Sequence, residues 1–472
     1  MAQWNIVRTS DAVWLAPGEP REIESDLVSR FQEEYGRAAS GTWFAPGRAN
    51  LNGEHIDFHA GRCLPMALAH GTYVAAAPRT DSRLRLRTLD ASLDDGVSTV
   101  ALDQIGPAAP AESAGSAESA GSAEMAAHPA RNGDAEHWSH YVTGVLWALR
   151  ELGRTQPEFQ LEAGFGADIL VISTLPIGGG LSSSAALECA AMMAFVALGT
   201  PLGLQNPLQD LNAALTRENR KQLAAACVRA EVEFVGAGTG GLDQTIAMRA
   251  RPGKVLSLDC RDFTVQPLDI GCILRGYRLI AVDTGEAHRL ADGKFGDRRA
   301  DAEAAAHLLG FTRLRDALPE KPRKADVTHV LEEFDRLAEQ LETLDGRSIP
   351  ACRRRLRHAL TEMVRSEKLH HLLSGEAYGV RHVTSTVGDI LTAGHMSMRD
   401  DAEVSFDVAD LIVETALAHG AEGARLIGGG FGGSVLVLIS PAAIPRLSAA
   451  FERISRKIRL LDVVPSAAAH AL

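Results

Sequence analysis

A glycine–serine stretch near the middle of the chain has the residue types of an anion-binding loop. Residues 175–190 read L-P-I-G-G-G-L-S-S-S-A-A-L-E-C-A, directly after the β-branched run A-D-I-L-V-I-S-T at 167–174. This order predicts a strand, a glycine loop and a helix start, where backbone N–H groups and the positive end of the helix dipole converge on phosphate. Serine hydroxyls there can hold phosphate oxygens or Mg²⁺. No lysine precedes the serines, so the stretch is not a G-x-x-x-x-G-K-[ST] loop. The alternative to an anion-binding loop is a glycine-rich turn before a serine-capped helix.

A polar cluster follows a short strand that we expect at 42–45 and that ends at Pro46-Gly47. The next ten residues bring together side chains that donate or accept hydrogen bonds: Arg48, Asn50, Glu54, His55 and Asp57. Such a set suits a ligand with many hydroxyl groups, because each hydroxyl needs a donor or an acceptor. The alternative is an exposed charged loop. The H-x-D spacing also fits a metal site, but no further cluster of ligands supports one.

Two further segments carry residues that could take part in phosphoryl transfer. Glu231 and Glu233 lie at the end of an expected helix, and Asp243 follows the glycine-rich run at 236–242. A carboxylate there could act as a general base or a Mg²⁺ ligand, or simply be a surface acid beside a turn. The run G-G-G-F-G-G within 427–434 lets the backbone approach a ligand, or forms a tight turn. Together these segments favour nucleotide-dependent phosphoryl transfer to a small hydroxylated acceptor.

The elements that must position these residues alternate along the chain. We expect further strands at 72–76, 83–88, 254–259 and 277–283, and helices at 26–35, 138–152, 183–198 and 211–235, with mostly helical sequence up to about residue 420. Residues 106–135 contain a repeat of small and acidic residues (A-E-S-A-G-S) that cannot bury a core. We interpret this segment as a disordered surface insertion.

Composition narrows the class of protein. The chain has 472 residues, of which 46% are hydrophobic and 23% charged, as in ordinary globular proteins. Its net charge of −12 argues against a nucleic-acid or membrane-surface binder. Six scattered cysteines without metal-type spacing favour reduced thiols. With no signal peptide and no long apolar run, we expect a cytoplasmic protein.

Three motifs in order resemble those of the galactokinase family, which belongs to the GHMP small-molecule kinase superfamily. G-R-A-N-L-N-G-E-H-I-D-F at 47–58 is similar to the family signature, usually G-R-V-N-L-I-G-E-H-T-D-Y. P-I-G-G-G-L-S-S-S-A-A-L-E at 176–188 resembles the phosphate loop, and L-I-G-G-G-F-G-G-S at 426–434 the third motif. The resemblance covers residues 42–440. It implies an ATP-dependent sugar 1-kinase, most simply a galactokinase, that forms sugar 1-phosphate and ADP.

The resemblance also implies a role for each matching residue. Asp243 takes the place of the catalytic aspartate that accepts or orients the sugar hydroxyl proton, and Arg48 that of the arginine beside it. The sugar-binding positions are Arg48, Glu54, His55, Asp57, Gly240, Asp243 and Phe295. The ATP-phosphate loop comprises Gly178, Gly179, Gly180, Leu181, Ser182, Ser183 and Ser184. Mg²⁺ would be bound by Ser184 and Glu231.

The expected architecture follows from the same resemblance. It is an α+β (mixed α/β) two-domain GHMP kinase fold with the active site in the cleft between the domains. We expect an N-terminal leader and helix at 1–40, an N-terminal kinase domain at 41–262 and a C-terminal kinase domain at 263–472. The expected partners are ATP and a small sugar, with no nucleic acid and no membrane. The expected state is a monomer or a weak homo-oligomer.

Departures from the family pattern leave the sugar open. Phe58, His59 and Thr239 differ from the usual residues, and Phe295 stands where the family has a tyrosine that contacts the sugar. Kinases for galacturonate, arabinose or N-acetylgalactosamine are therefore alternatives to a galactokinase. A non-catalytic sugar sensor is a further alternative. Such proteins tend to lose phosphate-loop residues, however, and this chain keeps the three serines of the loop as well as Asp243.

Overall fold

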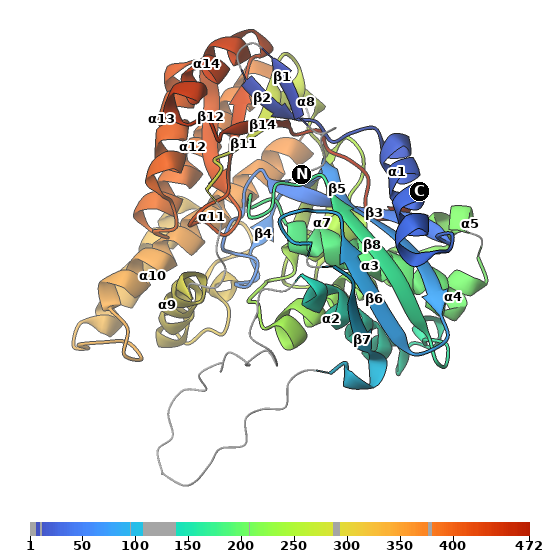
Figure 1. Cartoon of the computed structure of the whole chain (residues 1–472). Coiled ribbons are helices and arrows are strands. Elements are labelled where there is room, and N and C mark those ends of the chain that lie inside the picture. The colour runs from blue at the N-terminus through green and yellow to red at the C-terminus, as the bar shows by residue number, and fades with distance from the viewer. Residues whose placement is uncertain are drawn as a thin grey trace.

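The structure is a computed structural model in which three sheets are surrounded by helices (Figure 1). It describes residues 6–9, 12–94, 96–106, 138–206, 208–286, 293–375 and 380–472. The insertion expected at 106–135 lies outside these residues, apart from Gly106. Helices and strands are mixed along the described chain, so the expected α+β class is confirmed.

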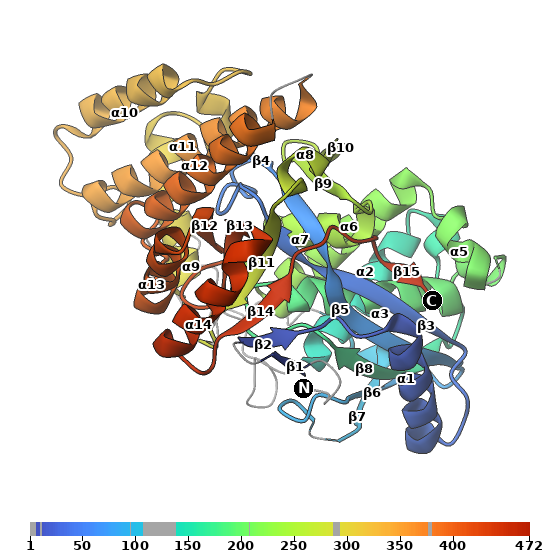
Figure 2. The ribbon, with the colours of Figure 1, turned by 90° about the horizontal axis from the view of Figure 1, so that it is seen from above.

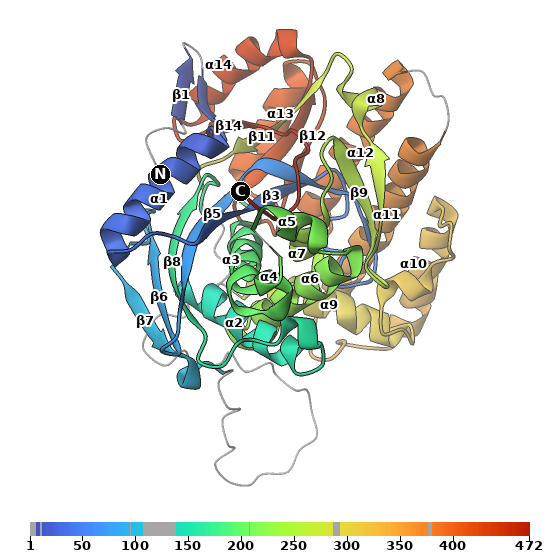
Figure 3. The ribbon, with the colours of Figure 1, turned by 90° about the vertical axis from the view of Figure 1, so that its right-hand side faces the viewer.

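The first sheet positions the phosphate loop. Within the described residues its strand order is β15 (His470–Ala471), β3 (Gly41–Asn50), β5 (Pro65–Arg79), β8 (Gly166–Ser173), β6 (Arg83–Thr88) and β7 (Ser98–Ala101). Side chains alternate between the two faces of β5, as they must along a strand. Tyr73 and Ala75 pack with α1 (Pro20–Tyr35), whereas Val74 and Ala76 face α2 (Ser139–Gly153) and α3 (Ser183–Gly199) (Figure 3).

Helix α3 is buried on nearly all sides, which explains its alanine-rich sequence. Small side chains let it lie close to the sheet and also to α2, α6 (Arg217–Arg229) and α7 (Leu242–Arg249). A helix that is apolar all round is typical of such a fully buried position. The first turn of α3, which carries the serines, is thereby held rigidly beside the start of α7.

The second sheet carries the other glycine-rich segment. Its order in the described residues is β1 (Ile6–Thr9), β2 (Ala12–Leu15), β14 (Arg459–Asp462), β11 (Arg278–Asp283), β13 (Ser434–Ile439) and β12 (Ala421–Ile427). Strands β12 and β13 pair antiparallel, and the G-G-G-F-G-G run is the turn between them. Apolar side chains of α13 (Asp407–Ala418) and α14 (Ile444–Ile454) cover one face, together with Met398 of α12 (Val380–Asp400).

A smaller sheet and a group of helices complete the molecule. Strands β10 (Thr264–Asp269), β9 (Lys254–Asp259) and β4 (Arg62–Cys63) form this sheet. Helices α9 (Lys294–Leu308), α10 (Lys324–Ala338) and α11 (Ile349–Ser374) pack around a common apolar core. The short helices are α4 (Pro201–Leu204), α5 (Leu208–Ala214) and α8 (Gly271–Leu274). Among the described residues, no helix has both the length and the apolar composition needed to span a membrane.

Near each end of the chain, a strand pairs with a strand that is distant in sequence. Strand β2 pairs in parallel with β14, so the N-terminal hairpin extends the second sheet (Figure 1). Strand β15 pairs with β3, so the C-terminus lies on the first sheet (Figure 2). A division of the chain near residue 262 would therefore leave β2 and β15 each paired with a strand on the other side of that division. That division stays a prediction.

Two local predictions need correction. Strand β3 does not end at Pro46, because the chain accommodates Pro46-Gly47 as an irregularity in the β3–β5 register and continues to Asn50. Arg48 consequently lies on a strand rather than in a loop. The helix expected at 211–235 is divided near Thr216, whose side chain and that of Asn219 form a capping box for α6. The last part of this region, Ala230–Val235, is a π-helical turn.

Candidate active site

The phosphate loop packs directly against the glycine turn of the second sheet. Ser434 Oγ donates a hydrogen bond of 2.6 Å to the carbonyl oxygen of Gly179. A Cβ atom on Gly428 would lie 2.7 Å from the carbonyl oxygen of Gly180, which leaves no room for a side chain. Gly180 and Ser182 both have positive φ angles, of 68° and 61°. The close approach and the left-handed backbone explain why glycines dominate both segments.

Arg48 and Asp243 form a bidentate ion pair beside this loop. Arg48 Nε lies 2.8 Å from Asp243 Oδ1, and Nη2 lies 3.0 Å from Oδ2. The third guanidinium nitrogen, Nη1, donates to the carbonyl oxygen of Gly180 at 2.6 Å. Ser182 Oγ also donates to the Asp243 carboxylate. The guanidinium is buried, and although burial opposes its charge, the carboxylates of Asp243 and Glu54 raise the pKa of Arg48.

Asp243 occupies the first turn of α7, just after the glycine-rich run that ends at Gly241. Gly241 has a φ of 89°, a left-handed conformation that turns the chain sharply into the helix. About a quarter of the Asp243 side chain remains accessible to solvent, in contrast to the buried Arg48. The buried arginine thus contacts the carboxylate on its protein side, and the exposed part of the carboxylate remains accessible to a ligand.

Ser184 and Glu231 meet at the start of α3. Ser184 Oγ donates to Glu231 Oε1 at 3.1 Å, and Gln244 Nε2 donates to the other Glu231 oxygen and to Glu188 Oε2. Burial, followed by the charge of Asp243, raises the pKa of Glu231 to about 7. Burial and the charge of Glu231 raise the pKa of Glu188 as well. Two carboxylates and a hydroxyl therefore face one another where a nearby cation would relieve their repulsion.

The sugar-signature segment contacts the second glycine turn. Glu54 Oε1 accepts a hydrogen bond of 2.9 Å from Gly428 N, and His55 Nε2 lies 3.1 Å from the carbonyl oxygen of Gly429. His55 has a φ of 59°, so the segment bends sharply here. Asp57 lies against Gly240, where an added Cβ would be only 2.3 Å from Asp57 Oδ2. Burial and the charge of Asp243 raise the pKa of Asp57 to about 6.

Three of the residues that depart from the family pattern lie together. The ring of Phe295 lies 5.0 Å from that of His55 and 5.9 Å from that of Phe58. The Phe58 and His59 rings are 4.6 Å apart, and burial with the charge of Arg299 lowers the pKa of His59 to about 3. The hydroxyl of Thr239, the fourth such residue, accepts a hydrogen bond from Gly241 N. The rings of His55, Phe58, His59 and Phe295 therefore lie together, and we call this group the aromatic wall.

The structure thus brings members of each predicted set, for sugar, phosphate and metal, into one region around Arg48, Asp243 and Ser184. It also adds partners that the residue patterns did not single out. Ser434 and Gly428 were visible only as parts of a glycine-rich turn, and Gln244 only as the neighbour of Asp243. The contacts of Ser434 and Gly428 join residues that are 255 and 374 positions apart, which spacing along the chain does not reveal.

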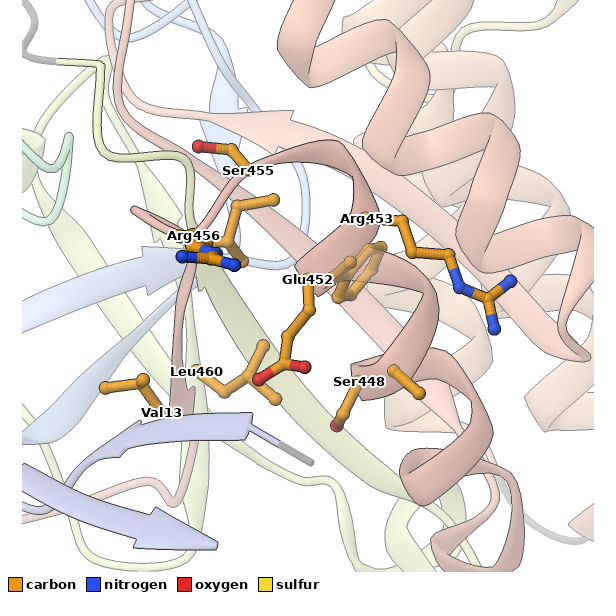
Figure 4. A pocket seen from close by; sticks show the side chains of 10 residues that line it. Val13, Ser448, Glu452, Arg453, Ser455, Arg456 and Leu460 are labelled. Atoms are coloured by element: carbon orange, nitrogen blue, oxygen red, sulfur yellow. The ribbon is translucent and has the colours of Figure 1, made fainter. Parts of the chain in front are cut away.

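A cavity between β2, α14 and β14 lies apart from these residues (Figure 4). Val13, Glu452, Arg456 and Leu460 are among the side chains that border it. Its lining within the described residues contains none of the positions predicted to bind sugar, phosphate or metal. The candidate site is therefore defined by its hydrogen bonds and charges, not by the size of a cavity.

Comparison with known proteins identifies the class. The model of the GHMP kinases N terminal domain matches residues 140–251, and that of the GHMP kinases C terminal matches residues 380–455. The crystal structure of Lactococcus lactis galactokinase complexed with galactose has a TM-score of 0.72 at 24% identity and covers 95% of this chain and 99% of its own. That of Methanococcus jannaschii mevalonate kinase has a TM-score of 0.52 at 15% identity, with 90% and 98% covered. The fold is that of a GHMP small-molecule kinase.

The family within this class follows from closer matches. The galactokinase galactose-binding signature matches residues 29–78. The galactokinase of Streptomyces coelicolor is 36% identical over 456 residues, which are 95% of this chain and 99% of that protein. The chain belongs to the galactokinase family. As a member of a kinase family it uses ATP as the phosphoryl donor.

Proposed function

We propose that the chain is a galactokinase, which transfers the γ-phosphoryl group of ATP to the anomeric hydroxyl of galactose and releases galactose 1-phosphate and ADP. One observation carries this proposal. Arg48, which belongs to the sugar signature, and its partner Asp243 are joined to the phosphate loop, because Arg48 donates to Gly180 and Asp243 accepts from Ser182. A carboxylate held at that junction is within reach of both a phosphoryl group and an acceptor hydroxyl.

Asp243 acts on the acceptor in this proposal. Its partly exposed carboxylate accepts the proton of the sugar hydroxyl or orients that hydroxyl toward the γ-phosphorus. The bidentate contact with Arg48 keeps the carboxylate in one orientation. The positive charge of Arg48 also lies close enough to offset negative charge that develops on the transferring group.

The phosphates of ATP would lie on the glycine–serine loop. Residues 178–184 connect a buried strand to the N-terminus of α3, so their backbone N–H groups and the helix dipole favour an anion. Ser182 and Gly180 take left-handed conformations that turn the loop around such an anion. The turn of the second sheet closes on the same loop through Ser434 and Gly428.

Ser184 and Glu231 have the chemistry of a Mg²⁺ site. Both offer hard oxygen ligands, and their oxygens are already 3.1 Å apart. Within the described part of the chain no group of three or more His, Cys, Asp or Glu could hold a metal alone. Mg²⁺ is commonly bound by one or two protein oxygens together with substrate phosphates, and it neutralises phosphate charge when bound. The two residues therefore fit the ion.

Galactose is the favoured acceptor among the sugars considered. The relatives at 30–37% identity carry the name galactokinase. Glu54, His55 and Asp57 also offer hydrogen-bond donors or acceptors to several hydroxyl groups. The aromatic side chains of Phe58 and Phe295 suit the apolar C–H face of a pyranose ring. A cytoplasmic location and a monomeric or weakly oligomeric state complete the proposal.

A sugar panel tests this function. The chain is incubated with Mg²⁺-ATP and galactose, galacturonate, arabinose or N-acetylgalactosamine, ADP release is followed, and ³¹P NMR identifies the product. We expect the highest kcat/KM with galactose and phosphorylation at position 1. A higher kcat/KM with another sugar would transfer the assignment to that sugar. A rise in Tm with galactose but no ADP release would instead make the chain a sugar sensor.

A further inference from the structure

A fully buried ion pair lies behind the sugar-signature segment. Arg425 of β12 and Glu362 of α11 have completely inaccessible side chains, and Arg425 Nη2 lies 2.9 Å from Glu362 Oε1. Removing two such charges from water is costly, so an ion pair in this position must be stabilised by further hydrogen bonds. Gly394 of α12 provides the space for the guanidinium, since a Cβ there would lie 2.7 Å from Arg425 Nη1.

Further hydrogen bonds of the pair go to three consecutive residues of the sugar-signature segment. Arg425 Nη1 donates to Asn52 Oδ1 at 2.7 Å. Glu362 Oε1 accepts from the backbone N–H groups of Gly53, at 2.9 Å, and Glu54, at 3.3 Å. A buried charge pair thus satisfies polar groups of a bend in which Gly53 has a φ of 108°.

Neighbouring side chains reinforce this anchor. His358, one turn before Glu362 on α11, hydrogen-bonds through Nε2 to the carbonyl oxygen of Glu54 at 3.1 Å. Arg365 donates to the second oxygen of Glu362 at 2.8 Å. Although burial opposes its ionisation, Arg425 and Arg365 hold the pKa of Glu362 below its ordinary value. Both carboxylate oxygens of Glu362 are therefore held by hydrogen bonds.

We propose that Glu362 and Arg425 are positioning residues that set the affinity for the sugar. They fix the backbone of residues 52–54, from which Glu54 reaches Gly428 and His55 faces the aromatic wall. Arg425 also lies three residues before Gly428, the first residue of the turn that follows β12, so β12 and its turn contact the sugar-signature segment at two points. This inference rests on the proposed function for the identity of the sugar. The loop proposed to bind the ATP phosphates, residues 178–184, is another segment and makes none of the hydrogen bonds of the pair.

Two variants separate positioning from simple stabilisation. Glu362→Gln removes the charge that accepts from Gly53 and Glu54. Asn52→Leu removes the acceptor for Arg425 in the segment but leaves the ion pair itself in place. The matched control is Asp168→Asn, because Asp168 is also a fully buried carboxylate held by arginines (Arg37, Arg79 and Arg85), but on β8 of the first sheet.

The readouts are the KM values for galactose and ATP, the Tm, and hydrogen exchange of the peptide covering residues 50–59. We expect both variants to raise the galactose KM by at least about tenfold, because each loses hydrogen bonds to charged or buried groups. The ATP KM should stay within about twofold of its original value. Exchange in residues 50–59 should accelerate, while that in residues 166–173 should not. Asp168→Asn should lower the Tm and leave the galactose KM unchanged.

The inference is wrong if a folded Glu362→Gln or Asn52→Leu variant keeps both the galactose KM and the exchange rate of residues 50–59. It is also wrong if the KM values for galactose and ATP rise together in proportion to the loss of Tm, as in the control. Failure of the proposed function appears separately, as absence of ADP release with galactose in the unmodified chain. In that case the hydrogen-exchange comparison still decides whether the pair anchors the segment.

Discussion

The contact between Gly240 and Asp57 leads to a sharp prediction about sugar binding. Gly240→Ala adds one methyl group, which would lie 2.3 Å from Asp57 Oδ2, 2.4 Å from Asp57 Cγ and 2.7 Å from the backbone nitrogen of Phe58. Gly240 does not have a positive φ angle, so alanine fits the backbone itself. The effect of the substitution is therefore a displacement of the Asp57 carboxylate and of the adjoining backbone at Phe58.

The size of this effect follows from the geometry. Ordinary van der Waals contact begins at 3.4 Å, so the contact at 2.3 Å must lengthen by about 1 Å. A displacement of about 1 Å in a group that binds substrate can reduce kcat/KM by about 100-fold. We expect kcat/KM for galactose to fall by about 10- to 100-fold, mainly through KM, while the KM for ATP changes little.

Gly238→Ala is the matched control for this prediction. It lies two residues earlier in the same glycine-rich run, and among the described residues its added Cβ would meet only Arg299 Nη1, at 3.9 Å. Steady-state kinetics with galactose and ATP, together with a Tm for each variant, compare the two substitutions. The reasoning fails if Gly240→Ala binds galactose normally, or if Gly238→Ala impairs the galactose KM to the same extent.

Three further predictions concern the neighbouring charges. Arg48→Lys should lower kcat by about 100-fold, because an ammonium group cannot reproduce the bidentate contact with Asp243; a kcat near that of the original would contradict this. Because the pKa of Asp57 is raised to about 6, galactose binding without nucleotide, measured by calorimetry, should weaken as the pH falls from 7.5 to 5 and the carboxylate is protonated. Asp57→Asn should remove this pH dependence. Glu231→Gln should raise the Mg²⁺ concentration for half-maximal activity by about tenfold and weaken Mn²⁺ binding detected by electron paramagnetic resonance in the presence of ATP; unchanged Mn²⁺ binding would exclude Glu231 as a ligand.

Much of the candidate site could be predicted from the sequence because its parts are local. The glycine–serine loop follows a β-branched run and precedes a helix-forming run, and this order alone predicts a strand, a turn and a helix start. The glycine run before Asp243 likewise predicts a turn into a helix. In each case backbone conformation and hydrogen bonding are decided within about ten residues.

The corrections and omissions arise where distant segments decide the outcome. Arg48 lies on β3, not in a loop, because pairing with β5 continues past Pro46. Arg425 and Glu362 read as ordinary charged residues of a strand and a helix, and nothing in their neighbourhood along the chain predicts that both are inaccessible to solvent. Their burial depends on a partner 63 residues away and on the bend at 52–54.

The central claim is that Asp243 acts on the acceptor hydroxyl during phosphoryl transfer. The most direct measurement compares the original chain with Asp243→Asn for the rate of galactose 1-phosphate formation and, by calorimetry, for galactose affinity. The account predicts that the variant loses at least about 1,000-fold in kcat, while its galactose Kd stays within about tenfold because the other sugar contacts remain. A variant that forms galactose 1-phosphate at a near-normal rate would contradict the account.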